Sequence, residues 1–378
     1  MRYGPLIIGM ALLLAACGVA PTASPLATSA SAEPSMASAP SAASAVPSTA
    51  AGGELDGLVA YVGGADPQIY LLDLATGESR QLTQLGPEDA ELTASGPMRP
   101  ALTCGFGPSG LQWAPDGARL AFAYGGCDSV VHIVELDGTL RRIGDGRSPA
   151  WSPDGSQLVF GQNYPYLGVP ENQSWPLLVV DMDGGDLTPR PLGDVPGGFY
   201  AGSPSYSPDG ALLAFTGPMP GSEDPTASAA YVMRSDGTDL MLVAQGAWPM
   251  GWLPDERLIV IEPTTGGSSA ADLGSGDFTP VAGGDPVEAI SPDGSLLLAS
   301  HFGDAENRVR LYEVAGKLVG EINGFAPTWS PDGTAFLVND AGSGALLVIG
   351  VDGTELGRYE LTGPVGGDQR ARWQPAAP

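Results

Sequence analysis

One ten-residue pattern recurs along the chain and limits the folds that are open to it. Residues 151–160 read WSPDGSQLVF, and close variants begin at positions 113, 206, 252, 290 and 329. A seventh, partial copy is Trp373-Gln374-Pro375. The copies follow one another at intervals of 38 to 55 residues. A repeat of this length is typical of a four-stranded propeller blade with variable loops.

The polar centre of the pattern has the composition of a type I turn. Such a turn favours Ser at its first position, Pro at its second and Gly at its fourth, and Ser152, Pro153 and Gly155 fill these positions. We expect Asp154 to accept bonds from nearby backbone amides, as short polar side chains do in turns. Aspartates spread round a ring of blades would lie too far apart to share an ion. The pattern therefore predicts a turn, with Trp151 wedged between neighbouring blades.

The strands between the turns predict the number of blades. Each unit contains short apolar runs bounded by Gly, Asp and Pro, which favours an antiparallel all-β array. Second strands are expected at 58–62, 120–124, 158–162, 212–216, 258–262, 296–300 and 335–339. This count gives a β-propeller of seven four-stranded blades. Six blades is the alternative, if the unit that has Glu256 in place of Gly and blurred strands over 263–282 is an insertion.

The two ends of the repeat region complement each other. The first unit has no WSPDG copy before it, and the segment Arg372–Pro375 has an opening strand with nothing after it. Together they make one complete blade. We therefore expect strands from both termini to close the ring, which removes free sheet edges.

The copies WSPDGSQLVF and YSPDGALLAF resemble the TolB-like, WD40-like PD40 β-propeller repeat. The resemblance covers residues 57–375, and it implies blades packed round a central channel and a role in a cell-envelope complex. Two copies depart from the pattern, with Glu256 at the Gly position and Ile290 at the aromatic position.

The first 53 residues have a different character. The apolar run 6–16 ends in Leu14-Ala15-Ala16-Cys17, which resembles a bacterial lipobox. This predicts a signal peptide over 1–16, too short to span a bilayer, and lipidation of Cys17; an ordinary secretory signal is the alternative. Residues 17–53 are dominated by Ala, Ser and Pro, which predicts a disordered tether before a propeller domain at 54–378. We expect an exported, lipid-anchored protein on the periplasmic or outer-surface side of a bacterial envelope.

The charge of the chain limits its partners. Net charge is -27, from 43 acidic and 16 basic residues. Such a chain repels nucleic acid and anionic lipid surfaces. We therefore expect no nucleic-acid partner, membrane attachment through the N-terminal lipid alone, and a monomer.

Sequence variation among the units points to one face of the ring as the binding face. Long segments fall in the second-to-third and interblade connections, at 84–109, 163–176, 193–204, 217–228 and 263–276. Binding residues are common on loops over a rigid scaffold, and exposed aromatics anchor partners. Candidate binding residues are therefore the loop aromatics Tyr164, Tyr166, Trp175, Phe199 and Tyr200; packing of the loops is the alternative role.

Signals for catalysis are weak. No Ser has Gly two residues before it and two after it, so the nucleophile-elbow pattern is missing. The only histidines, His132 and His301, follow the pattern of strand residues. We predict a non-catalytic scaffold, without a cofactor, that binds an envelope protein or polymer through the loop-rich face. The alternative is a propeller enzyme, a lyase or a glycan-active enzyme, with its site at the channel mouth.

Cys104 and Cys127 are expected to form a disulfide, because export places them in an oxidising compartment. A hairpin turning at Pro115–Gly117 pairs residues whose numbers sum to about 231–233, and the two cysteines sum to 231. The bond would staple a long loop. Mass spectrometry of a non-reduced digest should find the two cysteine peptides linked. Two free thiols under denaturing, non-reducing conditions would contradict the pairing.

Overall fold

The computed structural model divides the chain into two compact units, 1–40 and 41–378. The described residues all belong to the second unit, and Cys17 lies outside them. They are 55–91, 105–126, 128–163, 177–183, 185, 187–193, 202–222, 227–262, 265–301, 307–363 and 370–376. No helix within these ranges is long and apolar enough to cross a membrane.

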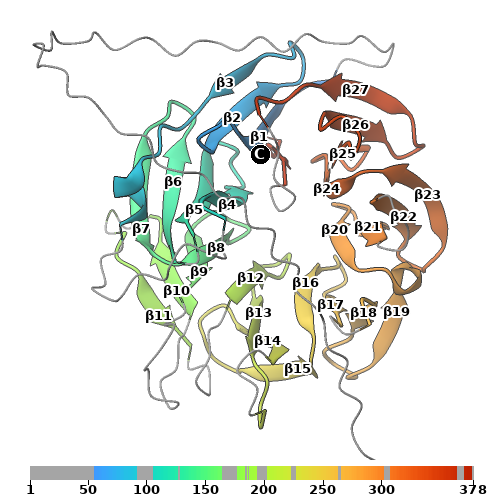
Figure 1. Ribbon diagram of the computed structural model, residues 1–378. Helices are drawn as coiled ribbons and strands as arrows, with labels where there is room; N and C mark the ends of the chain where they lie inside the picture. Colours follow the sequence, from blue (N-terminus) through green and yellow to red (C-terminus); the bar gives the residue numbers. More distant parts are fainter. Residues whose placement is uncertain are drawn as a thin grey trace, which may run out of the picture. The chain divides into compact units, whose positions relative to one another are not determined.

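The second unit is built of seven four-stranded antiparallel sheets in a ring, as Figure 1 shows. Strands are given from the innermost outward. The first blade contains β28 (Arg372–Trp373), β1 (Leu58–Gly63), β2 (Gln68–Asp73) and β3 (Ser79–Gln81), and the second contains β4 (Gly107–Trp113), β5 (Arg119–Gly125), β6 (Ser129–Glu135) and β7 (Leu140–Asp145). The third blade contains β8 (Arg147–Trp151), β9 (Gln157–Gly161), β10 (Leu177–Asp181) and β11 (Arg190–Leu192), and the fourth contains β12 (Gly202–Tyr206), β13 (Leu212–Pro218), β14 (Ser228–Arg234) and β15 (Met241–Gln245).

The remaining three blades have the same order. Their strands are β16 (Trp248–Trp252), β17 (Leu258–Ile261), β18 (Ser268–Ala271) and β19 (Phe278–Val281); β20 (Val287–Ile290), β21 (Leu296–His301), β22 (Arg308–Glu313) and β23 (Leu318–Asn323); β24 (Phe325–Trp329), β25 (Ala335–Asn339), β26 (Leu346–Gly350) and β27 (Glu355–Tyr359). Two short 3-10 helices, η1 (Pro87–Ala90) and η2 (Ala282–Gly284), lie in interblade connections.

The seven-blade prediction is confirmed, and the six-blade alternative is wrong. The doubtful unit is a complete blade, because β18 pairs with β17 from Leu258↔Ala271 to Ile261↔Ser268 and β19 pairs with β18. The expectation of one loop over 263–276 is also wrong, since β18 lies inside that segment. Its sequence, Ser-Ser-Ala-Ala, has weak strand propensity. Backbone pairing on both sides forms this strand, and a local pattern does not reveal it.

The ring is closed by strands from the two ends of the repeat region, as predicted. β28 pairs with β1 through Val59↔Trp373 and Ala60↔Arg372. The amide of Gln374 adds a bond of 2.8 Å to the carbonyl of Leu58. This pairing gives the first blade an innermost strand and leaves β1 without a free inner edge.

The hydrophobic core lies between the blades. Each of the clusters of buried side chains joins two neighbouring sheets, so that every interface round the ring has its own apolar layer. One cluster joins Val59 and Tyr61 of the first blade to Leu337 and Val348 of the last. Packing therefore closes the ring as well as pairing does, in the manner of a repeat array whose units contact only their neighbours.

The repeated Asp has the role expected from the turn. The carboxylate of Asp154 accepts bonds from the Ser152 hydroxyl at 2.6 Å and the Ser156 amide at 3.0 Å. The Ser152 hydroxyl in turn accepts the Gln157 amide at 2.9 Å, and Gly155 has a φ of 71°. Hydrogen bonds from the Ser152 hydroxyl, the Ser156 amide and the Ser156 hydroxyl lower the pKa of the Asp154 carboxyl to about 2. The same Ser–Asp pair recurs in later turns, at Ser207–Asp209, Ser291–Asp293 and Ser330–Asp332.

The motif Trp bridges neighbouring blades, as expected. Trp151 donates its indole N–H to the carbonyl of Gln112 at 3.1 Å, on the inner strand of the preceding blade. Trp113 donates to Arg372 at 3.0 Å, and Trp252 donates to Ser205 at 3.0 Å. Trp329 is the exception, because its buried indole nitrogen has no hydrogen-bond partner among the described residues. The preceding blade has Ile290 where the others have an aromatic residue.

The two cysteines of the predicted disulfide, Cys104 and Cys127, lie outside the described residues. The hairpin beside them has the predicted register, with Gly107 opposite Gly125 and Pro108 opposite Tyr124. The disulfide remains a prediction.

Two single variants, Trp151→Phe and Trp329→Phe, distinguish the stability contributed by the indole hydrogen bond from that contributed by apolar packing. Both side chains are nearly equally buried, at 8% and 7% exposure. Trp151→Phe loses the hydrogen bond to the Gln112 carbonyl, whereas Trp329→Phe removes an N–H that has no partner among the described residues. We expect Trp151→Phe to lose about 1–2 kcal/mol more stability in urea unfolding. Equal losses would show that the indole bond does not stabilise the interface.

The stability contributed by Asp154 should depend on pH. Its folded pKa lies below the ordinary value of 3.8, so its contribution is complete above about pH 4 and is lost as the pH falls through about 2. Because the turn is solvated, we expect Asp154→Asn to cost about 1 kcal/mol or less at neutral pH. Urea unfolding of both proteins from neutral pH to pH 2 should show this difference shrinking. A difference that stays constant would mean that charge plays no part.

Candidate ligand-binding channel

The two faces of the ring carry different connections. Because strands alternate in direction along each blade, the SPDG turns share one face with the third-to-fourth turns, and the second-to-third and interblade connections share the other. The predicted binding residues Tyr164, Tyr166, Trp175, Phe199 and Tyr200 belong to connections of the second, loop-rich face. All five lie outside the described residues, so their role stays a prediction.

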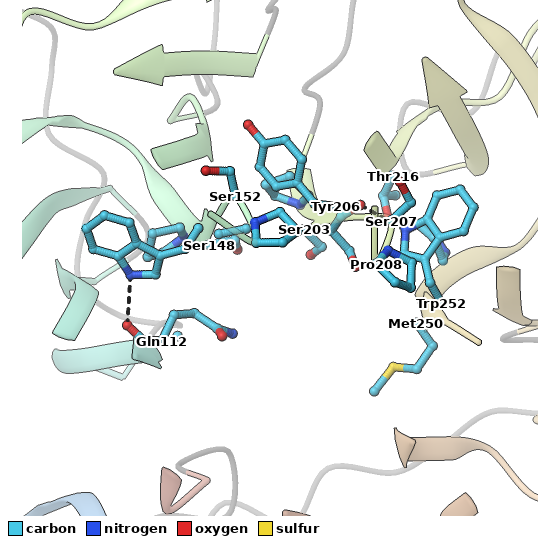
Figure 2. A pocket seen from close by; sticks show the side chains of 18 of the residues that line it. Gln112, Ser148, Ser152, Ser203, Tyr206, Ser207, Pro208, Thr216, Met250 and Trp252 are labelled. Carbon is cyan, nitrogen blue, oxygen red and sulfur yellow. Dashed lines mark hydrogen bonds between the residues drawn. The ribbon is translucent and has the colours of Figure 1, made fainter. Parts of the chain in front are cut away.

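A cavity of about 890 Å³ lies along the inner strands of four consecutive blades. Its walls are formed by β4, β8, β12 and β16, by the turns that follow them and by Arg372 of β28. Figure 2 shows Gln112 and Met250 extending into this space from opposite sides, with Ser203 and Tyr206 between them. The volume is in the range of sites for small ligands.

Serine and proline dominate the wall, and the inner strands β4, β8, β12 and β16 are each interrupted by a bulge. Pairing shifts between Arg147 and Ala150 in β8, and between Gly202 and Ser205 in β12. Ser148 and Ser203 have φ values of 52° and 50°, a left-handed conformation that is costly for a side chain other than glycine. In both strands a proline follows, and it has no N–H to leave unpaired. The channel wall therefore presents hydroxyls and apolar rings.

Trp248 marks the mouth of the cavity on the loop-rich face. It is the first residue of β16, lines the cavity and is 46% exposed. Its indole nitrogen donates to the Ser228 hydroxyl of the neighbouring blade at 2.6 Å, which orients the ring. A large aromatic side chain held in place and left exposed is a typical anchor for a partner.

Arg372 is the one fully charged side chain among the described residues that line the cavity. Loss of solvent, followed by repulsion from the nearby Arg370 guanidinium, lowers the pKa of Arg372 to about 10, which keeps it charged at neutral pH. The part of the lining that the structure describes includes no carboxylate and no imidazole, the groups most used in general acid–base catalysis. This wall is suited to binding.

A histidine–carboxylate pair lies elsewhere, in the sixth blade. His301 Nδ1 is 2.9 Å from a carboxylate oxygen of Asp285, while Arg310 and Tyr312 donate to the other oxygen at 3.1 and 2.7 Å. Burial raises the pKa of Asp285, but bonds from His301, Tyr312 and Arg310 outweigh it and lower the pKa. The carboxylate thus joins the connection before β20 to β21 and β22. His301 ends β21, as the strand pattern predicts, but its contact with Asp285 could not be predicted from the local sequence.

His132 has a structural role. It is 1% exposed, stacks on Phe122 with ring centroids 5.6 Å apart and places Nδ1 3.2 Å from the carbonyl of Val130. Burial lowers its pKa, so it is neutral at pH 7. Groups of three or more His, Cys, Asp or Glu suited to a metal ion are not found in the described part of the chain.

Comparison with known proteins identifies the fold. No protein-family model matches the sequence, and no curated protein matches it. Among solved structures, the chain is similar to TolB from Acinetobacter baumannii, with a TM-score of 0.51 and 16% identity over 86% of this chain and 68% of that one. The chain has a TolB-like β-propeller fold.

The TolB-like propeller is also similar to enzymes. An oligogalacturonate lyase from Vibrio parahaemolyticus matches with a TM-score of 0.51 and 16% identity, over 75% of this chain and 82% of that one. A puromycin hydrolase matches with a TM-score of 0.57 and 18% identity, over 86% of this chain; this chain spans 54% of its length. At these identities the likeness shows the fold alone.

Two functional candidates of the TolB-like propeller were missed in the sequence. Trp248 lies four residues before the motif Trp252, and the pair of tryptophans around Pro249 was the available signal. Arg372 was assigned to the closing strand, but nothing in its local sequence indicates a channel. Its position there depends on the pairing of β28 with β1.

Proposed function

We propose that this TolB-like propeller is a non-catalytic binding scaffold whose partner enters the channel mouth on the loop-rich face. The observation that carries the proposal is the make-up of the cavity wall. It combines an anchored, exposed Trp248 with Ser, Pro and Gln side chains, and the described residues of the wall include no carboxylate or imidazole. Rigid aromatic anchors with adaptable polar neighbours favour partner binding.

The partner that we propose is a protein or polymer of the bacterial cell envelope. The lipobox-like segment that ends in Cys17 supports a lipid-anchored protein, and the Ala/Ser/Pro-rich tether would reach roughly 35 Å. The net charge of -27 disfavours direct contact with anionic lipid or nucleic acid. The similarity to TolB agrees with such a role at the level of the fold.

A propeller enzyme is the second candidate function, and the His301–Asp285 pair is the observation that favours it. In many hydrolases a carboxylate orients a histidine that acts as the base. Here the carboxylate is shared with Arg310 and Tyr312, and none of these four residues lines the cavity. The pair therefore supports a structural network more than a catalytic one.

Photo-crosslinking from position 248 tests the binding proposal. A photoreactive phenylalanine analogue would replace Trp248 in the full chain, expressed in its native cells. The matched control carries the analogue at Phe278 of β19, which is 45% exposed on the outermost strand of the same blade. We expect one discrete adduct from position 248 and none from position 278.

Once crosslinking has identified the partner, two variants distinguish a binding scaffold from a propeller enzyme. Trp248→Ala should weaken binding of the crosslinked partner by about tenfold or more, as loss of an aromatic anchor does. His301→Ala should leave that affinity within about twofold, because His301 lies outside the cavity wall. Equal adducts from both positions, or chemical turnover of the partner that His301→Ala abolishes, would overturn the proposal.

A further inference from the structure

Arg372 is fixed in the channel wall by contacts with the second blade. Its Nε donates to the carbonyl of Leu111 at 3.1 Å, and its own carbonyl accepts the indole N–H of Trp113 at 3.0 Å. Leu111 and Trp113 flank Gln112, whose side chain also lines the cavity. The guanidinium is therefore held at its base, while its two terminal nitrogens have no hydrogen-bond partner among the described residues.

The charge of Arg372 is not compensated by the described part of the protein. Arg370, two residues earlier, is ion-paired with Glu288 at 3.3 Å. Loss of solvent, and then repulsion from this same Arg370, lower the pKa of Arg372. Ion pairs are otherwise common, and they occupy Arg119, Arg142, Arg190, Arg234, Arg257, Arg308, Arg310 and Arg358. Arg372 is half-buried and has no counter-charge among the described residues, so an anionic ligand in the channel would supply one.

We propose that Arg372 anchors an anion subsite in the channel and that the group it binds is a carboxylate. This inference rests on the proposed function of the channel as a binding site and names the chemistry of its ligand. Two terminal nitrogens of a guanidinium match the two oxygens of a carboxylate in a bidentate pair. The base of the fork is already held, so little conformational freedom is lost on binding.

The charge of the whole protein selects a monoanion over a dianion. At a net charge of -27 the long-range field repels anions, and the repulsion grows with ligand charge. A phosphate group carries nearly two charges at neutral pH. A carboxylate is therefore repelled less, while it can form the same bidentate pair with the Arg372 guanidinium. Trp113, Tyr206 and Met250 line the same cavity and offer apolar contact. The expected ligand therefore joins a carboxylate to an aromatic or aliphatic body.

Calorimetric titration of the full chain with matched probes tests the subsite. The probes are N-acetylphenylalanine, its neutral amide and phenyl phosphate, at constant pH and ionic strength. We expect the carboxylate to bind about tenfold or more tightly than the amide, because the amide cannot accept a charged bidentate pair. We also expect it to bind more tightly than the phosphate. A fourth probe, 3-phenylpropionate, tells a peptide terminus from a simple organic acid.

Variants locate the effect at one side chain. Arg372→Gln should abolish the preference for the carboxylate over the amide, and Arg372→Lys should reduce it. The control Arg234→Gln removes an arginine at the end of β14 whose side chain is 58% exposed and paired with Asp239. This variant should preserve the preference for the carboxylate. Thermal unfolding without probe verifies that each variant is folded.

Any of four results would overturn the subsite. They are no binding of any probe, equal affinity of the native protein for acid and amide, tighter binding of the phosphate, and a carboxylate preference that survives in Arg372→Gln. Failure of the proposed function looks different. If the probes bind through Arg372 but position 248 gives no adduct, the subsite stands and the partner proposal fails; if position 248 gives its adduct and no probe binds, the subsite alone fails.

Discussion

The pairing of β28 with β1 is the contact on which the rest of the ring depends. Only Val59↔Trp373 and Ala60↔Arg372 form its ladder, yet they bring together residues more than 300 positions apart. Without them the first blade lacks an inner strand, Trp113 loses the carbonyl of Arg372, and the apolar layer between the first and last blades loses Trp373. Closure also places Arg372 in the channel, so the same contact that removes a sheet edge creates the candidate anion subsite.

The contacts between blades are of two kinds, apolar packing and hydrogen bonds. Apolar clusters fill each interface, and at three interfaces the indole N–H of Trp113, Trp151 or Trp252 links one inner strand to the next. The indole N–H groups donate to backbone carbonyls, so the side chains of the accepting residues remain free to vary. Gln112 shows the consequence: its carbonyl holds Trp151, and its side chain lines the cavity. The frame and the site thus share residues without competing for the same atoms.

Sequence predicted most of the frame because each blade repeats the same local chemistry. Ser152, Asp154 and Gly155 determine a turn through contacts within a few residues, and such contacts can be inferred from composition and order. Prediction failed where local preference is weak. The strand β18 has the sequence Ser-Ser-Ala-Ala and exists because β17 and β19 pair with it. The hydrogen-bond network round Asp285 could not be predicted either, because His301, Arg310 and Tyr312 contact its carboxylate from two different strands.

The sequence by itself determined the all-β class, the seven repeats, the turn at each SPDG copy and the closure of the ring from its two ends. The turns depend on interactions between residues close in sequence, and the other three features follow from a pattern that recurs at intervals of 38 to 55 residues. The tertiary structure decided which side chains meet in the channel. Trp248, Gln112 and Arg372 come from three different blades, and their approach depends on the curvature of the ring and the bulges in its inner strands. The physical reason is that a repeat encodes its own blade, whereas a site in the channel depends on how all the blades pack together.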